Sequence, residues 1–221
     1  MTSARTHWRG SYINHFVDYC SFTRWSITLQ IMNIEIYNNV LSILLLKRPF
    51  LKNRINGPLE LEYVHNEIRS IYNYDGVLNP IFSIYTVFNG FAIDRNLQVP
   101  SRNWELFPNF VFFDLLETIS EIKEDYCGYG FLSNGVFPMF TDGDIGYICF
   151  DIINEKDPVI LKNSLMGDDL IIFDSSEKFL ESIDFYYKDL DYLSVLHGGR
   201  DLYIDKMKSM NPNSNYWDSI T

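Results

Sequence analysis

Residues 136–173 read VFPMFTDGDIGYICFDIINEKDPVILKNSLMGDDLIIF. Apolar residues in this stretch come in short runs, and Asp, Gly and Asn stand between the runs. Short apolar runs bounded by such turn residues are typical of β-strands joined by tight connections. The stretch therefore predicts a meander of four strands, over residues 136–140, 147–153, 159–161 and 170–173.

Apolar residues at helical spacing flank the meander, which predicts helices on both sides of it. Asn79 is a suitable N-cap for a helix through Phe88, because its side chain can accept a backbone N–H and Pro80 fits the first helical position. Asp114 is a second N-cap, and Glu117 stands at the capping-box position. The inward-facing residues of that helix are expected to be Leu115, Leu116, Ile119 and Ile122.

Three further helical stretches are expected, over residues 36–44 and 61–71 and, after Ser175 or Ser176, through Tyr187. Residues 109–113 form one more short run of strand character. The order of helices first, a meander of strands next and helices last favours an α+β fold over an alternating α/β fold. We expect a central, mostly antiparallel sheet flanked by helices.

Composition excludes two classes of protein. The chain has 221 residues, of which 47% are hydrophobic and 16% aromatic. This apolar content excludes intrinsic disorder, and the length suits one domain with an extension. The formal net charge is −11, and an acidic protein repels phosphate. Generic binding to a nucleic-acid backbone is therefore excluded.

The charge is distributed unevenly along the chain. Residues 1–60 hold seven basic and three acidic residues, whereas residues 140–191 hold 13 acidic residues and four lysines. We interpret residues 1–60 as an N-terminal extension and residues 61–221 as the folded domain. The aromatic-rich first 31 residues are either helical, or an aromatic tail, or translated sequence upstream of a start at Met32.

Cysteine usage and hydropathy bear on the compartment. Cys20, Cys127 and Cys149 are far apart and odd in number, which indicates a reducing compartment. The longest apolar run, over residues 40–46, is much shorter than the ~20 residues that a membrane span requires. No apolar core of a signal peptide follows the first arginines. We expect a cytoplasmic protein that does not bind membranes.

The glycine-rich loop does not predict a nucleotide site. Gly130 and Gly135 have the spacing of a phosphate-binding loop, but Val136 stands where that loop needs its lysine. Without that cation and a following helix, nothing stabilises a triphosphate. A flexible loop or turn is the better interpretation.

Metal and nucleophile motifs are equally weak. The run Asp142-Gly143-Asp144 starts like a calcium loop, but Ile153 stands where an EF-hand needs its last glutamate. A β-hairpin turn accounts for the same residues. The four histidines are dispersed, and no histidine lies near Cys127 or Cys149 in the sequence to activate a thiol. We therefore expect no catalytic residue, no metal and no cofactor.

Short motifs follow one another in a defined order over residues 68–217. They are Phe88-Asn89-Gly90 at a helix end, Leu106-Phe107 to Phe113-Asp114-Leu115, Gly135 to Asp144 continued by Tyr147 to Asp151, and Leu170 to Leu180 with its Ser-x-x-x-Phe-Leu helix. In this order the chain resembles the SUKH superfamily. That group comprises fungal cell-wall-assembly regulators of the Smi/Knr type and many bacterial toxin-immunity proteins.

The resemblance implies a single SUKH-like domain and a non-catalytic function. The implied function is that of an immunity protein, or antitoxin, which binds and neutralises a cognate toxin that is often a nuclease. The alternative is a regulatory or scaffold module of the Smi/Knr type. The sequence departs from the family at Asp142-Gly143-Asp144, where a longer glycine-rich stretch is usual, and residues 1–60 have no counterpart.

Two acidic turns are the candidate partner contacts. They carry Asp142 and Asp144 in the first turn and Asp168 and Asp169 in the second. A nuclease must present a basic surface to its phosphate substrate, and an acidic surface accelerates encounter with it. The predicted partner is therefore a protein toxin with a basic surface. For each of these residues, a solvated loop acid remains the alternative.

Overall fold

The computed structural model describes residues 31–92, 105–107, 110–125, 128–141, 146–163, 168–189 and 200–219. Its centre is a six-stranded sheet in the order β1-β2-β3-β4-β5-β6, in which every neighbouring pair is antiparallel. The strands are Glu105–Phe107 (β1), Phe110–Phe112 (β2), Val136–Thr141 (β3), Gly146–Asp151 (β4), Val159–Asn163 (β5) and Leu170–Phe173 (β6). The predicted α+β class is confirmed.

The four strands predicted from residues 136–173 are all present, and β2 falls inside the run predicted at 109–113. The first strand, Glu105–Phe107, was not predicted, because three residues are too few to show an alternating pattern. Its residues are buried without alternation. Thr141 pairs with Tyr147 at the end of the antiparallel β3–β4 pair, and the tight turn predicted between these strands lies outside the described residues.

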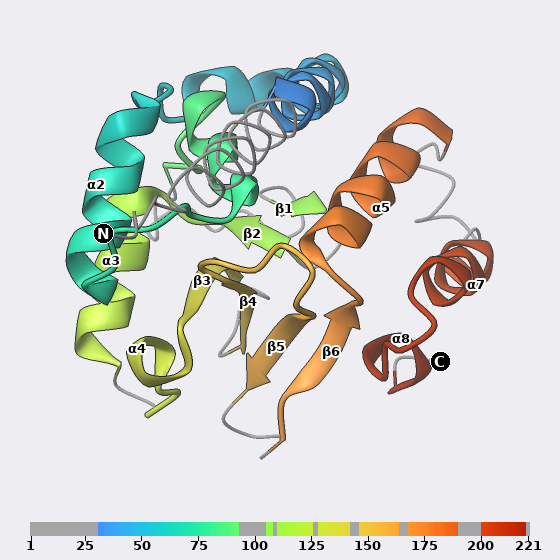
Figure 1. Cartoon of the computed structure of the whole chain (residues 1–221). Helices are drawn as coiled ribbons and strands as arrows, with labels where there is room; N and C mark the ends of the chain where they lie inside the picture. Colours follow the sequence, from blue (N-terminus) through green and yellow to red (C-terminus); the bar gives the residue numbers. More distant parts are fainter. Residues whose placement is uncertain are drawn as a thin grey trace, which may run out of the picture.

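Helices lie on either side of the sheet (Figure 1). In that view α2, α3 and α4 lie on the β3 side, and α5, α7 and α8 lie on the β6 side. Residues 31–47 form a further helix that ends before Pro49, as predicted. The labelled helices are Pro49–Asn53 (η1), Leu61–Tyr72 (α2), Pro80–Thr86 (η2), Leu115–Glu124 (α3), Phe131–Asn134 (α4), Ser176–Asp189 (α5), Arg200–Met210 (α7) and Tyr216–Ser219 (α8).

None of the described helices is both long enough and apolar enough to cross a membrane. The N-caps predicted at Asp114 and at Ser175 agree with the structure. Asp114 accepts the N–H of Glu117, and Ser175 accepts the N–H of Lys178. One inward-facing residue was wrong, because Leu116 is 60% exposed and Thr118 takes the buried position. Positions 115, 118, 119 and 122 share one face of the helix, and residue 116 lies a step of about 100° away from it.

The element after Asn79 differs from its prediction. The N-cap is confirmed, since the Asn79 side chain accepts the N–H of Ile81, but the helix is of the 3₁₀ type and ends at Thr86. Ser83 Oγ donates to the Pro80 carbonyl, and Thr86 Oγ1 donates to the Ser83 carbonyl. Both bonds satisfy carbonyls three residues back. Short, buried segments commonly take this tighter spacing as connectors.

Residues 31–60 contribute to the core of the domain. Tyr37, Val40, Leu44 and Leu51 are buried in the same hydrophobic cluster as the sheet. Arg48 donates to the carbonyl of Glu105 over 2.7 Å, so this segment also contacts the edge strand. Where the domain begins in the sequence remains a prediction, but the predicted extension packs against it from residue 31 onward.

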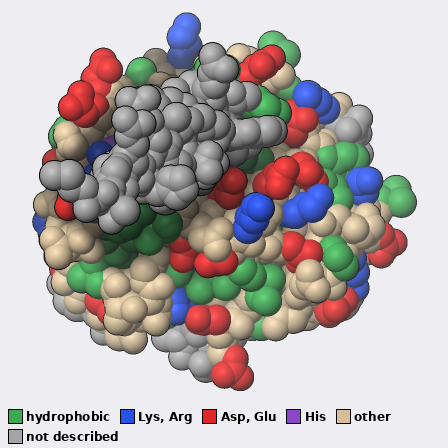
Figure 2. All heavy atoms as spheres, in the orientation of Figure 1, with side chains coloured by type: hydrophobic (Ala, Val, Ile, Leu, Met, Phe, Trp, Pro, Cys, Tyr) green, Lys and Arg blue, Asp and Glu red, His purple; other side chains and the backbone are tan. Residues whose placement is uncertain are grey.

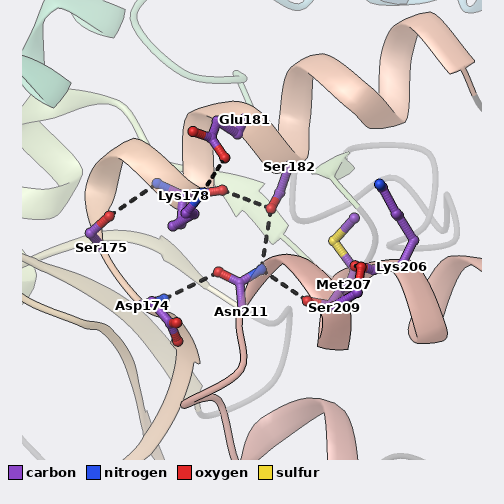
Figure 3. A network of polar contacts seen from close by, with 9 residues as sticks. All are labelled: Asp174, Ser175, Lys178, Glu181, Ser182, Lys206, Met207, Ser209 and Asn211. Atoms are coloured by element: carbon purple, nitrogen blue, oxygen red, sulfur yellow. Dashed lines mark hydrogen bonds and ion pairs between the residues drawn. The ribbon is translucent and has the colours of Figure 1, made fainter.

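Asn211 joins the last elements of the chain to the sheet. Its Nδ2 atom donates to the Met207 carbonyl and to Ser182 Oγ on α5, while its Oδ1 atom accepts the Asp174 N–H (Figure 3). The residue is 1% exposed. A buried amide with all these partners satisfied holds its neighbours in one arrangement.

The residues after Asn211 cover the free edge of β6. Asn215 accepts the N–H of Ile171, Ser214 donates to the carbonyl of the same residue, and Trp217 donates to the Ile172 carbonyl. An open edge strand offers backbone groups to other chains. Side chains of the C-terminal segment occupy those groups here.

The backbone at Gly90 predicts a severe effect of a small substitution. Gly90 has φ +71°, and a Cβ atom there would collide with the backbone of Phe113 and Asp114. We expect Gly90→Ala to lower the free energy of unfolding by more than about 3 kcal/mol. Gly128 has φ +68° with open space around it, so Gly128→Ala should cost only about 1–2 kcal/mol. Equal costs in urea denaturation would contradict the clash.

The Asn211 network predicts a second pair of effects. Asn211→Ala removes the acceptor of the Asp174 N–H and the amide that joins Ser182 Oγ to the Met207 carbonyl, so we expect a loss of about 1–3 kcal/mol in the free energy of unfolding. Asn213 also bonds Asp174 but is exposed. Asn213→Ala should stay within about 0.5 kcal/mol of wild type. Urea denaturation of both variants tests this, and a larger loss for Asn213→Ala would refute the assigned role.

Candidate partner-binding surface

The structure describes one of the two predicted acidic turns. Asp168 and Asp169 directly precede β6, and both are exposed. Asp142 and Asp144 lie outside the described residues. The strands on either side of them are described, however, and their register shows which end of the sheet that connection belongs to.

The strands that flank the two predicted turns begin or end at the same end of the sheet. Gly146 at the start of β4 pairs with Asn163 at the end of β5, and Tyr147 pairs with Lys162. Thr141 at the end of β3 pairs with Tyr147, and Leu170 at the start of β6 pairs with Leu161. We call the end of the sheet formed by these strand ends, with Asp168 and Asp169, the hairpin end.

Asp169 is already paired within the protein. Its Oδ2 atom lies 2.9 Å from Nζ of Lys162, whose side chain is only 7% exposed, whereas the Asp169 side chain is 48% exposed. A buried ammonium requires a counter-charge. Asp168, in contrast, makes no ion pair within the described residues.

A group of aromatic side chains lies beside this ion pair. Tyr147, directly opposite Lys162, donates its hydroxyl to Glu121 Oε2 on α3 over 2.7 Å. Its ring lies 5.4 Å from those of Tyr129 and Phe131. Sequence reasoning placed Tyr147 in a strand but missed this group, because the contacts join residues from three elements.

Cys149 lies on the same sheet face and cannot act as a nucleophile. It is fully buried, and burial raises the pKa of its thiol. Lys162 lowers that pKa and Asp169 raises it again, both by smaller amounts. A thiol that stays protonated and has no access to solvent is inert. Cys20 and Cys127 lie outside the described residues.

In the glycine-rich loop, a carboxylate of the chain itself occupies the position that a bound anion would take. Asp125 Oδ1 accepts the N–H of Tyr129, and Asp125 Oδ2 accepts the N–H of Gly130. These are the amides that a phosphate would need. The loop therefore binds a carboxylate of the chain itself.

A second concentration of acids occurs at the opposite end of the sheet. It comprises Asp151 at the end of β4, Glu155 and Asp157 on the β4–β5 connection, and Asp174 and Glu177 near the start of α5. The two parts are in contact, since Ser176 donates its N–H to the Glu155 carbonyl. Figure 2 shows acidic side chains over this view of the molecule with Lys and Arg side chains among them. We call this the loop end.

Most acids of the loop end are engaged in the fold. Asp151 accepts the N–H groups of Ile153 and Asn154, and Asp157 accepts from the Asn154 side chain. Burial and the neighbouring Asp151 raise the pKa of Asp157. These carboxylates hold their own turn in place. Glu177, in contrast, is exposed, and its side chain makes no hydrogen bond or ion pair within the described residues.

Metal-ligating residues do not gather in the described part of the chain: no group of three or more His, Cys, Asp or Glu there could hold an ion. His65 is half-buried on α2, and burial followed by the nearby Arg69 lowers its pKa. His7, His15 and His197 lie outside the described residues. No protein-family model and no curated protein sequence matches the chain.

The Lys162–Asp169 pair predicts a stability effect that depends on its partner. Asp169→Asn leaves a buried ammonium without counter-charge, and we expect a loss of about 1–3 kcal/mol, less than for a fully buried pair because Asp169 is half exposed. Lys162→Met should be close to neutral. In a Lys162→Met background, Asp169→Asn should cost almost nothing. Urea denaturation of the four proteins measures this coupling, and equal costs in both backgrounds would rule it out.

Proposed function

We propose that this protein is a non-catalytic immunity protein that binds and neutralises a cognate toxin, a nuclease, through an acidic surface. The proposal rests on the resemblance of residues 68–217 to the SUKH superfamily and on the charge of the chain. The observation that carries it is the 13 acidic residues against four lysines over residues 140–191. The described residues of this range include β4, β5, β6 and all of α5.

The charge suits a protein that must capture a nuclease quickly. A nuclease carries basic residues where phosphates bind, and complementary potentials raise association rates by about 10–10³-fold at low salt. Such a partner needs neither a metal nor a nucleophile on this chain.

Co-expression with the product of the neighbouring gene tests the proposal. If that product is a toxin, we expect this protein to protect the host cell and to copurify with the toxin as a one-to-one complex. Failure to protect, or failure to form the complex with purified components, would overturn the proposal. A neighbouring gene that encodes no toxin, with recovery of signalling proteins in pull-downs, would favour the regulatory module.

A salt series on the purified complex tests the charge argument separately. Exposed charges are screened beyond about 10 Å at 0.1 M salt. We therefore expect Kd to rise as the salt concentration increases from 0.05 to about 0.5 M. If Kd does not change with salt concentration while the protein still protects the cell, the proposed function stands and electrostatic complementarity is not the basis of binding.

A further inference from the structure

One face of the sheet is left partly uncovered between β4 and β6. Tyr147 lies opposite Lys162, Cys149 lies opposite Ile160, and Ile160 lies opposite Ile171, so these side chains share one face. Ile160 and Ile171 are half-buried. We call the face that carries Tyr147, Ile160, Lys162 and Ile171 the open sheet face.

Helix α5 covers most of the opposite face of the same strands, where only Leu170 of the described β6 residues stays half-buried. Phe179 of α5 packs its ring against Phe150 of β4 and Phe173 of β6, at 5.0 Å and 5.3 Å between ring centres. On the side of the open sheet face, helices α3 and α4 pack over β3, toward one margin of the sheet (Figure 1). The half-buried isoleucines of β5 and β6 lie beyond them.

We propose that the open sheet face is the surface on which the protein partner docks, and that the partner contributes an arginine-bearing segment with an apolar side chain beside the arginine. The inference rests on the proposed function and assigns partner binding to one surface of the protein. The apolar side chain covers Ile160 and Ile171, and the guanidinium pairs with Asp168 at the rim.

Charge selects this occupant. Asp169 is neutralised by Lys162, so the rim charge of the hairpin end comes from Asp168, which is exposed and makes no hydrogen bond or ion pair within the described residues. An apolar centre with a charged rim is the usual layout of a protein interface. A second copy of this chain fits less well, because two molecules of net charge −11 would bring like charges together.

Charge also favours the hairpin end over the loop end. The carboxylates of Asp151, Asp157 and Asp174 accept hydrogen bonds from their own turns or from Asn213. An arginine at the loop end would share those carboxylates with the N–H groups that they already hold, whereas Asp168 holds none. The loop end is the competing location, because Glu177 and Ile153 are exposed there, and the matched variants below compare the two ends.

The matched variants Asp168→Asn and Glu177→Gln test the location. Each removes one exposed negative charge, the first at the hairpin end and the second at the loop end. With the purified toxin complex, we expect Asp168→Asn to weaken binding by about threefold at low salt, as for an exposed ion pair, and Glu177→Gln to leave Kd unchanged. The reverse pattern, or equal effects, would overturn the docking site while leaving the proposed function intact.

A synthetic peptide of alternating arginine and leucine provides a probe that needs no toxin. Titrated into the ¹⁵N-labelled full chain, it should shift the amide resonances of residues 146–149, 159–163 and 168–171 most strongly. A peptide of alternating glutamate and leucine is the control and should leave them unmoved. Largest shifts at residues 151–157 and 174–181, or no saturable shift at all, would reject the open sheet face. Failure of the toxin complex with success of the peptide would reject only the function.

Discussion

The ring of Phe179 is the contact on which the architecture depends. It packs against Phe110 of β2, Phe140 of β3, Phe150 of β4 and Phe173 of β6, so one side chain of α5 contacts four strands of the sheet. Aromatic contacts of this kind add to the large area that each ring buries. With α5 on that face, the half-buried isoleucines of β5 and β6 lie on the other. The open sheet face is thus a consequence of where the core lies.

The same arrangement leaves two sheet edges to be closed, and distant parts of the chain close them. At β1, the carbonyls of Glu105 and Leu106 accept hydrogen bonds from Arg48 and Tyr187. At β6, the C-terminal segment supplies Ser214, Asn215 and Trp217. Side chains thus satisfy the outer backbone groups where no further strand pairs with them. With its edges occupied, the sheet presents a face to a partner instead of an edge.

Local patterns in the sequence predicted most of the elements, and long-range contacts account for what they missed. Asn79, Asp114 and Ser175 carry the information for their helix starts in their own side chains, and all three act as caps. Strand β1 has no such signal, since its three residues are held by pairing with β2. The Lys162–Asp169 pair depends on the register of β5 with β6, and the Tyr147–Glu121 bond depends on how α3 lies against β4. In the sequence, nothing about the spacing of either pair distinguishes these residues from residues that make no contact.

The register also changes how the charge of the chain is understood. Counted along the sequence, the acids of residues 140–191 all appear equivalent. In the fold, Asp151, Asp157 and Asp174 serve as acceptors that hold turns, and Asp169 serves as the counter-ion of a buried lysine. Those acids stabilise the fold: Lys162 compensates the charge of Asp169, and the other three carboxylates hold backbone or amide N–H groups in place. Recognition therefore falls to the few acids without internal partners. Among these, Asp168 lies next to the strands that carry half-buried apolar side chains.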